Sequence, residues 1–395
     1  MPGRPCWVEI RTRSLERNYQ FLADVAAPHA ELLAIVKADA YGHSLDLCAP
    51  AVVRAGAQWL GVTSVEEGVA ARAVCSDARI LAISGAFAGQ GAGVVRHRLT
   101  PVAWEHWQLD ELENAARAAG AEAGSIPVHL EIDTGMSRQG ADLESIDSFL
   151  ARFGNGSPLK LDGVMTHLFA ADEADGAITQ EQLARLALAL EKVRAGGLHA
   201  EWLNVGNSAA LLSGQATAIG AIAARCGMKA LVRPGLALYG LAPQFDPAFS
   251  GSEPAALAKA HQRLEPVLSW KTKVVGIRSV PAGASVGYNG TFVATEPMRL
   301  ALLAVGYGDG LERRLGNRFS LLVRGQRAPL VGRISMDQAV LDVTEIPDAQ
   351  GGDEVVILGT QGAEMITAFD HAKVAGTIPW EIFTRIGPRV ARISV

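Results

Sequence analysis

Cysteine is scarce in this chain, and its four copies stand far apart. They are Cys6, Cys48, Cys75 and Cys226, and no two of them have the Cys-x-x-Cys spacing that is typical of metal and redox sites. This scatter argues against a disulfide framework and against a zinc site. We therefore expect free thiols in a reducing compartment and no bound metal.

Long apolar runs and blocks of basic charge are also missing. The first residues, MPGRPCWVEIR, have no apolar core of the kind found in a signal peptide, and no segment approaches the length of a membrane span. The net charge is -5, with acidic and basic residues mixed along the chain, which argues against nucleic acid or an anionic membrane as a partner. The sequence predicts a cytoplasmic protein that acts on a small molecule.

Short apolar runs in a regular order are what the chain does have. Its 395 residues, 49% hydrophobic and 19% charged, are enough for about two well-packed domains. Apolar runs alternate with Ala-rich amphipathic stretches, and eight of the runs are predicted strands: 32–36, 59–63, 79–84, 99–103, 127–132, 159–166, 200–205 and 229–233. Eight strands with seven crossovers favour an α/β fold, a (β/α)8 barrel over residues 12–243, over a six-strand Rossmann sheet.

The pattern changes near residue 262. From there, β-rich runs separated by glycine turns predict a β-dominated domain over residues 262–395, with one short helix near 364–374. The strand-like segment 6–11 is predicted to join this second domain. Residues 244–261 begin rich in Pro, Gly and Ser and then become Ala-rich, so we predict a linker or insertion there.

Lys37 lies at the C-terminal end of the first predicted barrel strand, where barrel enzymes place their chemistry. Burial of a lysine costs desolvation of its charge, and a common use of such a residue is an amine with a lowered pKa that forms a Schiff base with a carbonyl compound or with pyridoxal phosphate. The alternative is a lysine that extends its ammonium group to solvent from a strand end.

Other polar side chains follow later strands in the same way. Arg138 follows the fifth strand, His167 the sixth, Asn207 and Ser208 the seventh, and Arg233 ends the eighth. All should meet at one end of the barrel. Each also has a simpler interpretation: His167 as a core histidine, Arg138 as a solvated loop residue, and Asn207-Ser208 as a helix cap. Their common position favours a functional site.

A phosphate site is also predicted. Ser208 at a helix start and the backbone of Gly235 and Leu236 come from the loops after strands seven and eight, where barrels commonly bind phosphate. Tyr41 is expected to reach the same group from the first loop. A lysine that can form an imine beside a phosphate cradle indicates pyridoxal phosphate, although a sugar-phosphate aldolase would show similar parts.

These segments resemble the alanine racemases, pyridoxal-phosphate enzymes with a barrel domain and a C-terminal β domain. The matching segments occur in the family's order over nearly the whole chain: VKADAYGH, DTGMSR, MTHLFAADE, NSAA, RPGLALYG, VGYNGTF, VGYGDG, VGRISMDQ and IPWEI. The resemblance implies the fold predicted above and an isomerase that interconverts L-alanine and D-alanine, with D-alanine used for cell-wall peptidoglycan or catabolised.

The resemblance also implies a two-base mechanism in a homodimer. Lys37 would form the Schiff base with the cofactor and serve as one base, and Tyr288 of the other subunit would act on the opposite face of the substrate's Cα. Arg233 would face the pyridine nitrogen and keep it unprotonated, because two cations in contact repel each other. His167 would orient Arg233 and Tyr288.

The substrate contacts implied by the family are few. Arg138 and the Met336 backbone N–H would bind the substrate carboxylate, and Tyr307 would narrow the site. From the residues alone, Tyr288 and Tyr307 would be packing residues of a β domain, and Met336 a core residue. Four further residues would line the access route: Asp172, Arg313, Arg333 and Ile378.

Two positions depart from the family pattern. Many members carry a carbamylated lysine where this chain has Glu131, and we hypothesise that its carboxylate supplies the negative charge that steadies Arg138. Trp380 in IPWEI stands where the family has a tyrosine that touches the phosphate. An indole N–H donates a hydrogen bond but accepts none, so Trp380 either donates to the phosphate or forms a wall of the pocket.

Three rival functions stay open from the sequence. A serine racemase or a racemase of broader range would share the motifs, because an apolar pocket discriminates one hydroxyl or methylene weakly. A decarboxylase of the same two-domain plan would want an acidic partner for the pyridine nitrogen, which Arg233 is not. A non-enzymatic pyridoxal-phosphate carrier would resemble the barrel alone.

Overall fold

The computed structural model describes residues 3–154, 156–173, 176–245 and 255–395, which form two compact units. The barrel unit comprises Arg13–Ala40 and Cys48–Glu265. The β unit comprises Met1–Thr12, Tyr41–Leu47 and Pro266–Val395. The division places the short segment Tyr41–Leu47, just after Lys37, in the β unit, which the sequence did not indicate.

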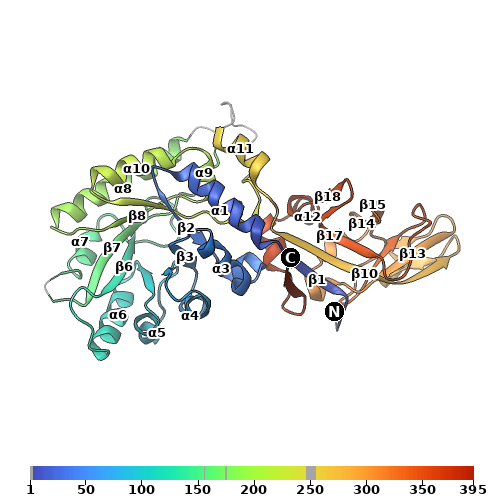
Figure 1. Cartoon of the computed structure of the whole chain (residues 1–395), viewed down its shortest axis with the longest axis horizontal. Coiled ribbons are helices and arrows are strands. Elements are labelled where there is room, and N and C mark those ends of the chain that lie inside the picture. Colours follow the sequence, from blue (N-terminus) through green and yellow to red (C-terminus); the bar gives the residue numbers. More distant parts are fainter. Residues whose placement is uncertain (1–2, 155, 174–175, 246–254) are drawn as a thin grey trace. The chain divides into compact units, whose positions relative to one another are not determined.

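Eight parallel strands close into a barrel, as predicted (Figure 1). Their pairing follows chain order, and the last strand returns to the first, with Glu31 opposite Leu231. Every predicted run overlaps one of them: β2 Glu31–Ile35, β3 Trp59–Val62, β4 Arg79–Ala82, β5 Thr100–Ala103, β6 Ile126–Glu131, β7 Leu159–Met165, β8 Trp202–Asn204 and β9 Lys229–Val232.

Helices follow the strands around the barrel (Figure 1). Local signals start several of them: Ser64 caps α4 by accepting from the Glu67 N–H, and the Gln108 side chain in α6 accepts from the N–H groups of Trp104 and Glu105. The helices that lie wholly or partly in the barrel unit are α1 Thr12–Ala26, α2 Lys37–Gly42, α3 Leu45–Arg54, α4 Val65–Val74, α5 Gly91–Arg96, α6 His106–Ala118, α7 Ile146–Leu150, α8 Ala177–Ala195, α9 Ser208–Leu212, α10 Ala216–Arg225 and α11 Ala255–Arg263.

The interior of the barrel contains a polar layer among its aromatic side chains. The guanidinium of Arg79 lies 4.0 Å from the ring centroid of Trp59 and pairs with Asp162 at 2.5 Å. The fully buried His129 lies 3.5 Å from the same carboxylate. Gly163 makes room for this histidine, because a Cβ at position 163 would approach the imidazole to 2.6 Å.

The predicted linker over 244–261 lies partly outside the described residues, since 246–254 are not among them. Its second half is helix α11, whose Leu257 and Ala260 are buried, and the guanidinium of Arg263 at its end lies 5.5 Å from the ring of Phe21. This part of the segment is therefore ordered structure of the barrel unit.

The β unit is built on the long strand β10 (Leu268–Val280), and β1 (Cys6–Ile10) lies antiparallel beside it. Its sheet has the order β15-β14-β17-β10-β1-β19, with β13 and β16 continuing from β10 and β18 from β17. The remaining strands are β11 Ser285–Val286, β12 Phe292–Val293, β13 Met298–Leu303, β14 Ser320–Val323, β15 Gln326–Pro329, β16 Ala339–Asp342, β17 Glu354–Gln361, β18 Glu364–Ile366 and β19 Ala391–Ser394.

The helix predicted near 364–374 begins later than expected. Residues Glu364–Ile366 form strand β18, and helix α12 runs from Ala368 to Ala375. Thr367 and Asp370 set this start through a reciprocal capping box. A second helix, α13 (Pro379–Thr384), begins at Pro379, a residue that favours the first helical position.

Short 3-10 helices carry several of the residues predicted for the site. They are η1 Leu236–Tyr239 in the barrel unit and η2 Tyr288–Gly290, η3 Tyr307–Asp309 and η4 Arg313–Leu315 in the β unit. No helix among the described residues is both long and apolar enough to cross a membrane. The four cysteines are free thiols.

Candidate active site

Lys37 follows β2 after a single residue, at the C-terminal end of the strand. Burial lowers the pKa of its ammonium group, and the charges of Arg138 and Arg233 lower it further, while the Glu67 carboxylate acts in the opposite direction. Glu67 also fixes the backbone here, accepting from the N–H of Ala38 at 2.8 Å and of Thr63 at 2.7 Å. A larger fraction of the Lys37 side chain is therefore a neutral, nucleophilic amine than for an exposed lysine.

The turn that follows Lys37 is left-handed. Residues 38–41 all have positive φ, between 52° and 55°, although none of them is glycine. Such backbone costs an L-residue roughly 1–2 kcal/mol. The turn ends at Gly42, which has φ +77° and where a Cβ would lie 2.4 Å from the Phe383 carbonyl oxygen. The Gly42 carbonyl accepts from Arg392 Nε at 3.1 Å, so contacts within the β unit hold the end of the turn.

Arg233 is buried at the end of β9, and four of its five N–H donors have partners. Nη1 donates to the backbone carbonyl and the side-chain oxygen of Asn204, at 2.8 and 2.6 Å. Nη2 donates to the Thr166 carbonyl at 3.0 Å and to His167 Nδ1 at 3.1 Å. Burial lowers the pKa of the guanidinium to about 10, so it stays charged near neutral pH. Among the described residues, only its Nε–H has no partner.

His167 is a hydrogen-bond acceptor in this arrangement. A guanidinium has no acceptor atom, so the contact with Arg233 makes His167 Nδ1 the unprotonated nitrogen and puts the proton on Nε2. Burial lowers the pKa of this imidazole to about 3, and the charges of Arg233, Arg138 and Lys37 contribute. His167 is thus a neutral histidine that helps to orient Arg233.

The residues predicted for a phosphate cradle lie at the start of α9 and of η1. Ser208 Oγ accepts from the N–H groups of Gly235 at 3.0 Å and Ala237 at 3.3 Å, which leaves its hydroxyl proton for another partner. Leu236, between them, is buried, and its N–H has no partner in the described part of the chain. Asn207 caps α9 through the Ala210 N–H at 3.0 Å. A buried orphan donor beside a free hydroxyl proton fits a phosphate oxygen.

The loop after β6 carries Arg138 and is shaped by Asp133, which accepts from the N–H groups of Gly135 and Met136 at 2.8 and 2.9 Å. Arg138 is exposed on this loop. Its charge, together with those of Lys37 and Arg233, makes the electrostatic potential at this end of the barrel favourable for anions.

Glu131 is buried at the end of β6, and its direct partner is the Gln139 amide, which donates to it. Burial raises the pKa of this carboxyl to about 7; the Gln139 hydrogen bond and the charges of Arg233 and Arg138 act against that rise. The structure places Glu131 within electrostatic range of Arg138, and the contact that holds the carboxyl comes from Gln139 instead.

Tyr288, Tyr307 and Met336 lie on three loops of the β unit whose backbones approach one another closely. The Tyr307 N–H donates to the Ser335 carbonyl at 3.0 Å, and a Cβ at Gly306 would lie 2.3 Å from that oxygen. A Cβ at Gly287 would lie 3.1 Å from the Arg333 nitrogen. The side chains of Tyr288, Tyr307 and Met336 are 68%, 42% and 54% exposed, so they are not packing residues of their own domain.

The remaining predicted residues lie on loops and helix ends. Trp380 is half-buried in α13, and Ile378 is the exposed residue just before that helix. Arg313 begins η4 and is exposed. Asp172 is exposed in the loop after β7.

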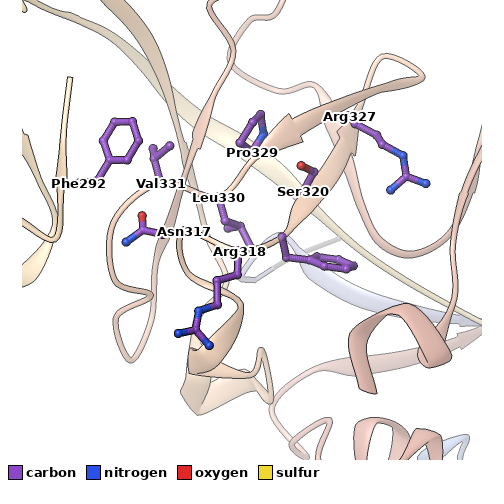
Figure 2. A pocket seen from close by; sticks show the side chains of 9 residues that line it. Phe292, Asn317, Arg318, Ser320, Arg327, Pro329, Leu330 and Val331 are labelled. Carbon is purple, nitrogen blue, oxygen red and sulfur yellow. The ribbon is translucent and has the colours of Figure 1, made fainter. Parts of the chain in front are cut away.

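A separate hollow of about 320 Å³ lies in the β unit, between residues near β14 and β15 and the loop at Asn317 (Figure 2). None of the predicted site residues lines it. One of its two arginines, Arg327, is paired with Glu364 at 2.7 Å. The described side chains around this hollow hold no nucleophile beside a base, and we assign it no chemistry.

A buried lysine with a lowered pKa, a buried arginine with one donor unused, and unpaired donors at Ser208 and Leu236 at one end of a barrel fit the class of pyridoxal-phosphate enzymes. Comparison with known proteins narrows this class. The family model "Alanine racemase, N-terminal domain" matches residues 10–243, and "Alanine racemase, C-terminal domain" matches residues 267–394. The chain therefore belongs to the alanine racemase family.

Relatives agree over nearly the full length. An alanine racemase of Syntrophobacter fumaroxidans is 37% identical over 381 residues, which cover 96% of this chain and 95% of that protein. An alanine racemase structure from Streptomyces lavendulae is 32% identical with a TM-score of 0.86, covering 100% of this chain and 98% of that one. The structure of the Bartonella henselae alanine racemase, which has covalently bound pyridoxal phosphate, is 27% identical with a TM-score of 0.81 and covers 100% of both chains.

Proposed function

We propose that this chain is an alanine racemase that uses pyridoxal 5'-phosphate to interconvert L-alanine and D-alanine. The observation that carries the proposal is Arg233: a buried, charged guanidinium whose Nε–H is the one donor left unused by the described residues. That donor suits the pyridine nitrogen of the cofactor, which it would keep unprotonated. The full-length similarity to alanine racemases supports the same conclusion.

The barrel residues would hold the cofactor in place. The Ser208 hydroxyl and the Leu236 N–H would donate to its phosphate, with Tyr41 and Trp380 at the same group and His167 orienting Arg233. Pyridoxal phosphate, when bound through Lys37, makes the Cα proton of an amino acid acidic. An arginine partner for the ring nitrogen moderates that effect, which limits side reactions such as transamination.

Two groups of the protein would move the proton. Lys37 Nζ, whose pKa is lowered by burial, would take or give a proton on one face of Cα. Tyr288 Oη would act on the opposite face. Racemisation needs one base on each face, because a single base tends to return the proton to the side that it left. Arg138 and the Met336 N–H would hold the substrate carboxylate, and Tyr307 would narrow the site around its methyl group.

We also propose a homodimer in which the β domain of each subunit completes the active site of the other. The exposure of Tyr288, Tyr307 and Met336 on the β unit supports this proposal, because a partner subunit would cover them. In this arrangement residues 262–395 with strand 6–11 form the contributing domain, and residues 12–243 form the cofactor-binding domain. Asp172, Arg313, Arg333 and Ile378 would line the access route. We place the enzyme in the cytoplasm, in the synthesis or catabolism of D-alanine.

The first experiment is chiral chromatography of L-alanine and of D-alanine, each incubated with the purified protein and pyridoxal phosphate. Both should converge on the same near-equal mixture, and Lys37→Ala should abolish the conversion. Conversion of serine at a comparable kcat/KM would establish the broader range instead. Failure with a full amino-acid panel, despite a bound cofactor, would favour the carrier function.

A further inference from the structure

The turn that carries Met336 has two backbone donors without partners. Ser335 closes the turn: its N–H donates to the Gln338 carbonyl at 2.9 Å, and its Oγ accepts from the Gln338 N–H at 3.0 Å. Between them, neither the Met336 N–H nor the Asp337 N–H has a partner among the described residues. Two adjacent free N–H groups on an exposed turn can receive a carboxylate.

Hydrogen bonds from neighbouring residues hold the carbonyl groups of this turn in place. The Ser335 carbonyl accepts from the Tyr307 N–H at 3.0 Å. The Met336 carbonyl accepts from the Gly308 N–H at 2.9 Å and from Arg389 Nη2 at 3.2 Å. Because a trans peptide is planar, its N–H points away from its C=O. Holding these two carbonyls therefore aims the Met336 and Asp337 N–H groups in the opposite direction.

Asp309 connects Arg389, which contacts the Met336–Asp337 turn, to the loop that carries Tyr307. Its buried carboxylate accepts from Arg389 Nε at 2.7 Å, from Arg4 Nη2 at 3.0 Å and from the Gly306 N–H at 2.8 Å. Arg389 Nη2 also donates to Asp337 Oδ1 at 2.9 Å. One guanidinium thus contacts the buried carboxylate, the Met336 carbonyl and the Asp337 side chain, which the single ammonium of a lysine cannot do.

We propose that Asp309 and Arg389 are positioning residues for substrate binding: through the Met336–Asp337 turn, they aim the backbone N–H groups that bind the substrate carboxylate. The proposal rests on the function proposed above. Neither residue touches the substrate. Their effect should fall on the affinity for the carboxylate and leave the proton-transfer groups, Lys37 and Tyr288, unchanged.

The test compares Arg389→Met, Arg389→Lys and Asp309→Asn with the wild-type enzyme. We expect KM for both alanine enantiomers to rise about tenfold in Arg389→Met, the effect of losing a charged hydrogen bond, while kcat changes less than about twofold. The inhibition constant of propionate, which is alanine without its amino group, should rise by the same factor. Arg389→Lys and Asp309→Asn should give smaller rises of the same kind.

Arg327→Met is the matched control, because Arg327 forms an exposed pair with Glu364 in the same unit and contacts no residue of the turn. It should leave KM and the propionate constant unchanged. Cofactor absorbance and molar mass by light scattering are recorded for each variant.

Three outcomes would overturn the proposal. The first is unchanged KM and propionate constants in Arg389→Met and Asp309→Asn, even with a lower melting temperature. The second is a fall in kcat alone. The third is a rise in KM that appears only together with loss of the dimer mass. Absence of racemisation in the wild-type enzyme would refute the proposed function. That result is distinct from the three outcomes above, which all require an active wild-type enzyme.

Discussion

The positive charges at the C-terminal end of the barrel, together with burial, lower the pKa values of single residues there. Burial and the charge of Arg138 lower the pKa of Lys37, and burial with the charge of Arg233 lowers the pKa of His167 to about 3. A larger fraction of the lysine is thereby unprotonated and able to accept a proton, and the histidine is a neutral hydrogen-bond acceptor. The sequence indicated a lowered pKa for Lys37 from its place at a strand end, whereas the neutral state of His167 follows from which strand ends meet in space.

Glu131 gives a pH-dependent prediction. Its folded-state pKa is raised to about 7, so the folded protein binds more protons than the unfolded chain between about pH 4.5 and 7, and this residue's contribution to stability is lost as pH rises through that window. Glutamine does not ionise, so the Glu131→Gln variant does not lose this stability as the pH rises. The melting temperature of the variant relative to wild type should therefore increase by about 5 °C between pH 5 and pH 8.

Thermal unfolding at both pH values measures this effect, with the exposed Glu122→Gln as control. A difference in melting temperature that stays constant with pH would contradict a buried Glu131 with a raised pKa. The same variant should weaken substrate binding if the charge of Glu131 steadies Arg138, and an unchanged KM would count against that hypothesis.

Trp380 gives a second prediction at this scale. If its indole only forms a wall of the cofactor pocket, Trp380→Phe should retain pyridoxal phosphate through gel filtration as well as wild type does, measured by absorbance. Ser208→Ala is the contrast, because it removes the hydroxyl that we assign to the phosphate, and we expect about a tenfold weaker cofactor affinity. Ready loss of cofactor from Trp380→Phe would show that the indole N–H is a phosphate donor.

Among the elements, the left-handed turn after Lys37 has four consecutive non-glycine residues with positive φ, a strained backbone conformation. Ala38 is exposed and has φ 52°, a conformation that glycine adopts without penalty. Ala38→Gly should therefore leave stability unchanged or raise it by up to about 1 kcal/mol, because relief of strain offsets the added backbone entropy. Ala184→Gly, at an exposed site inside α8, should lower stability by about 1 kcal/mol.

Chemical denaturation of both variants measures the contrast. Equal destabilisation by the two glycine substitutions would mean that the turn is not strained in solution.

Elements differ in how well the sequence predicted them. The eight barrel strands were predicted correctly because each is an apolar run bounded by turn residues, and buried parallel strands have no other pattern. The left-handed turn was not predicted, since Ala-Asp-Ala-Tyr has no strong preference for positive φ. Gln139, Asn204, Asp309 and Arg389 were missed because their residue types are common on surfaces, and only the folded contacts distinguish them.

At the scale of the whole molecule, we expect each active site to contain Lys37 of one subunit and Tyr288 of the other. Lys37→Ala and Tyr288→Phe should each be nearly inactive alone, because each removes one base from every site. Heterodimers formed from an equal mixture of the two would contain one site with both defects and one intact site. About a quarter of wild-type activity should therefore return on mixing after mild dissociation, measured as alanine racemisation. If no activity returns in verified heterodimers, the two bases belong to one subunit.

The segment Tyr41–Leu47 belongs to the β unit, although it follows directly on the barrel residues that include Lys37. It leaves the barrel four residues after Lys37, and its Gly42 is fixed by Phe383 and Arg392 near the C-terminus. A barrel cut off at residue 265 would keep the lysine and lose the anchor of its turn. A chimaera that joined this barrel to the C-terminal domain of a distant relative would also lose these contacts, unless residues 41–47 were exchanged together with that domain. The boundary between the units is therefore not a point at which the chain can be recombined freely.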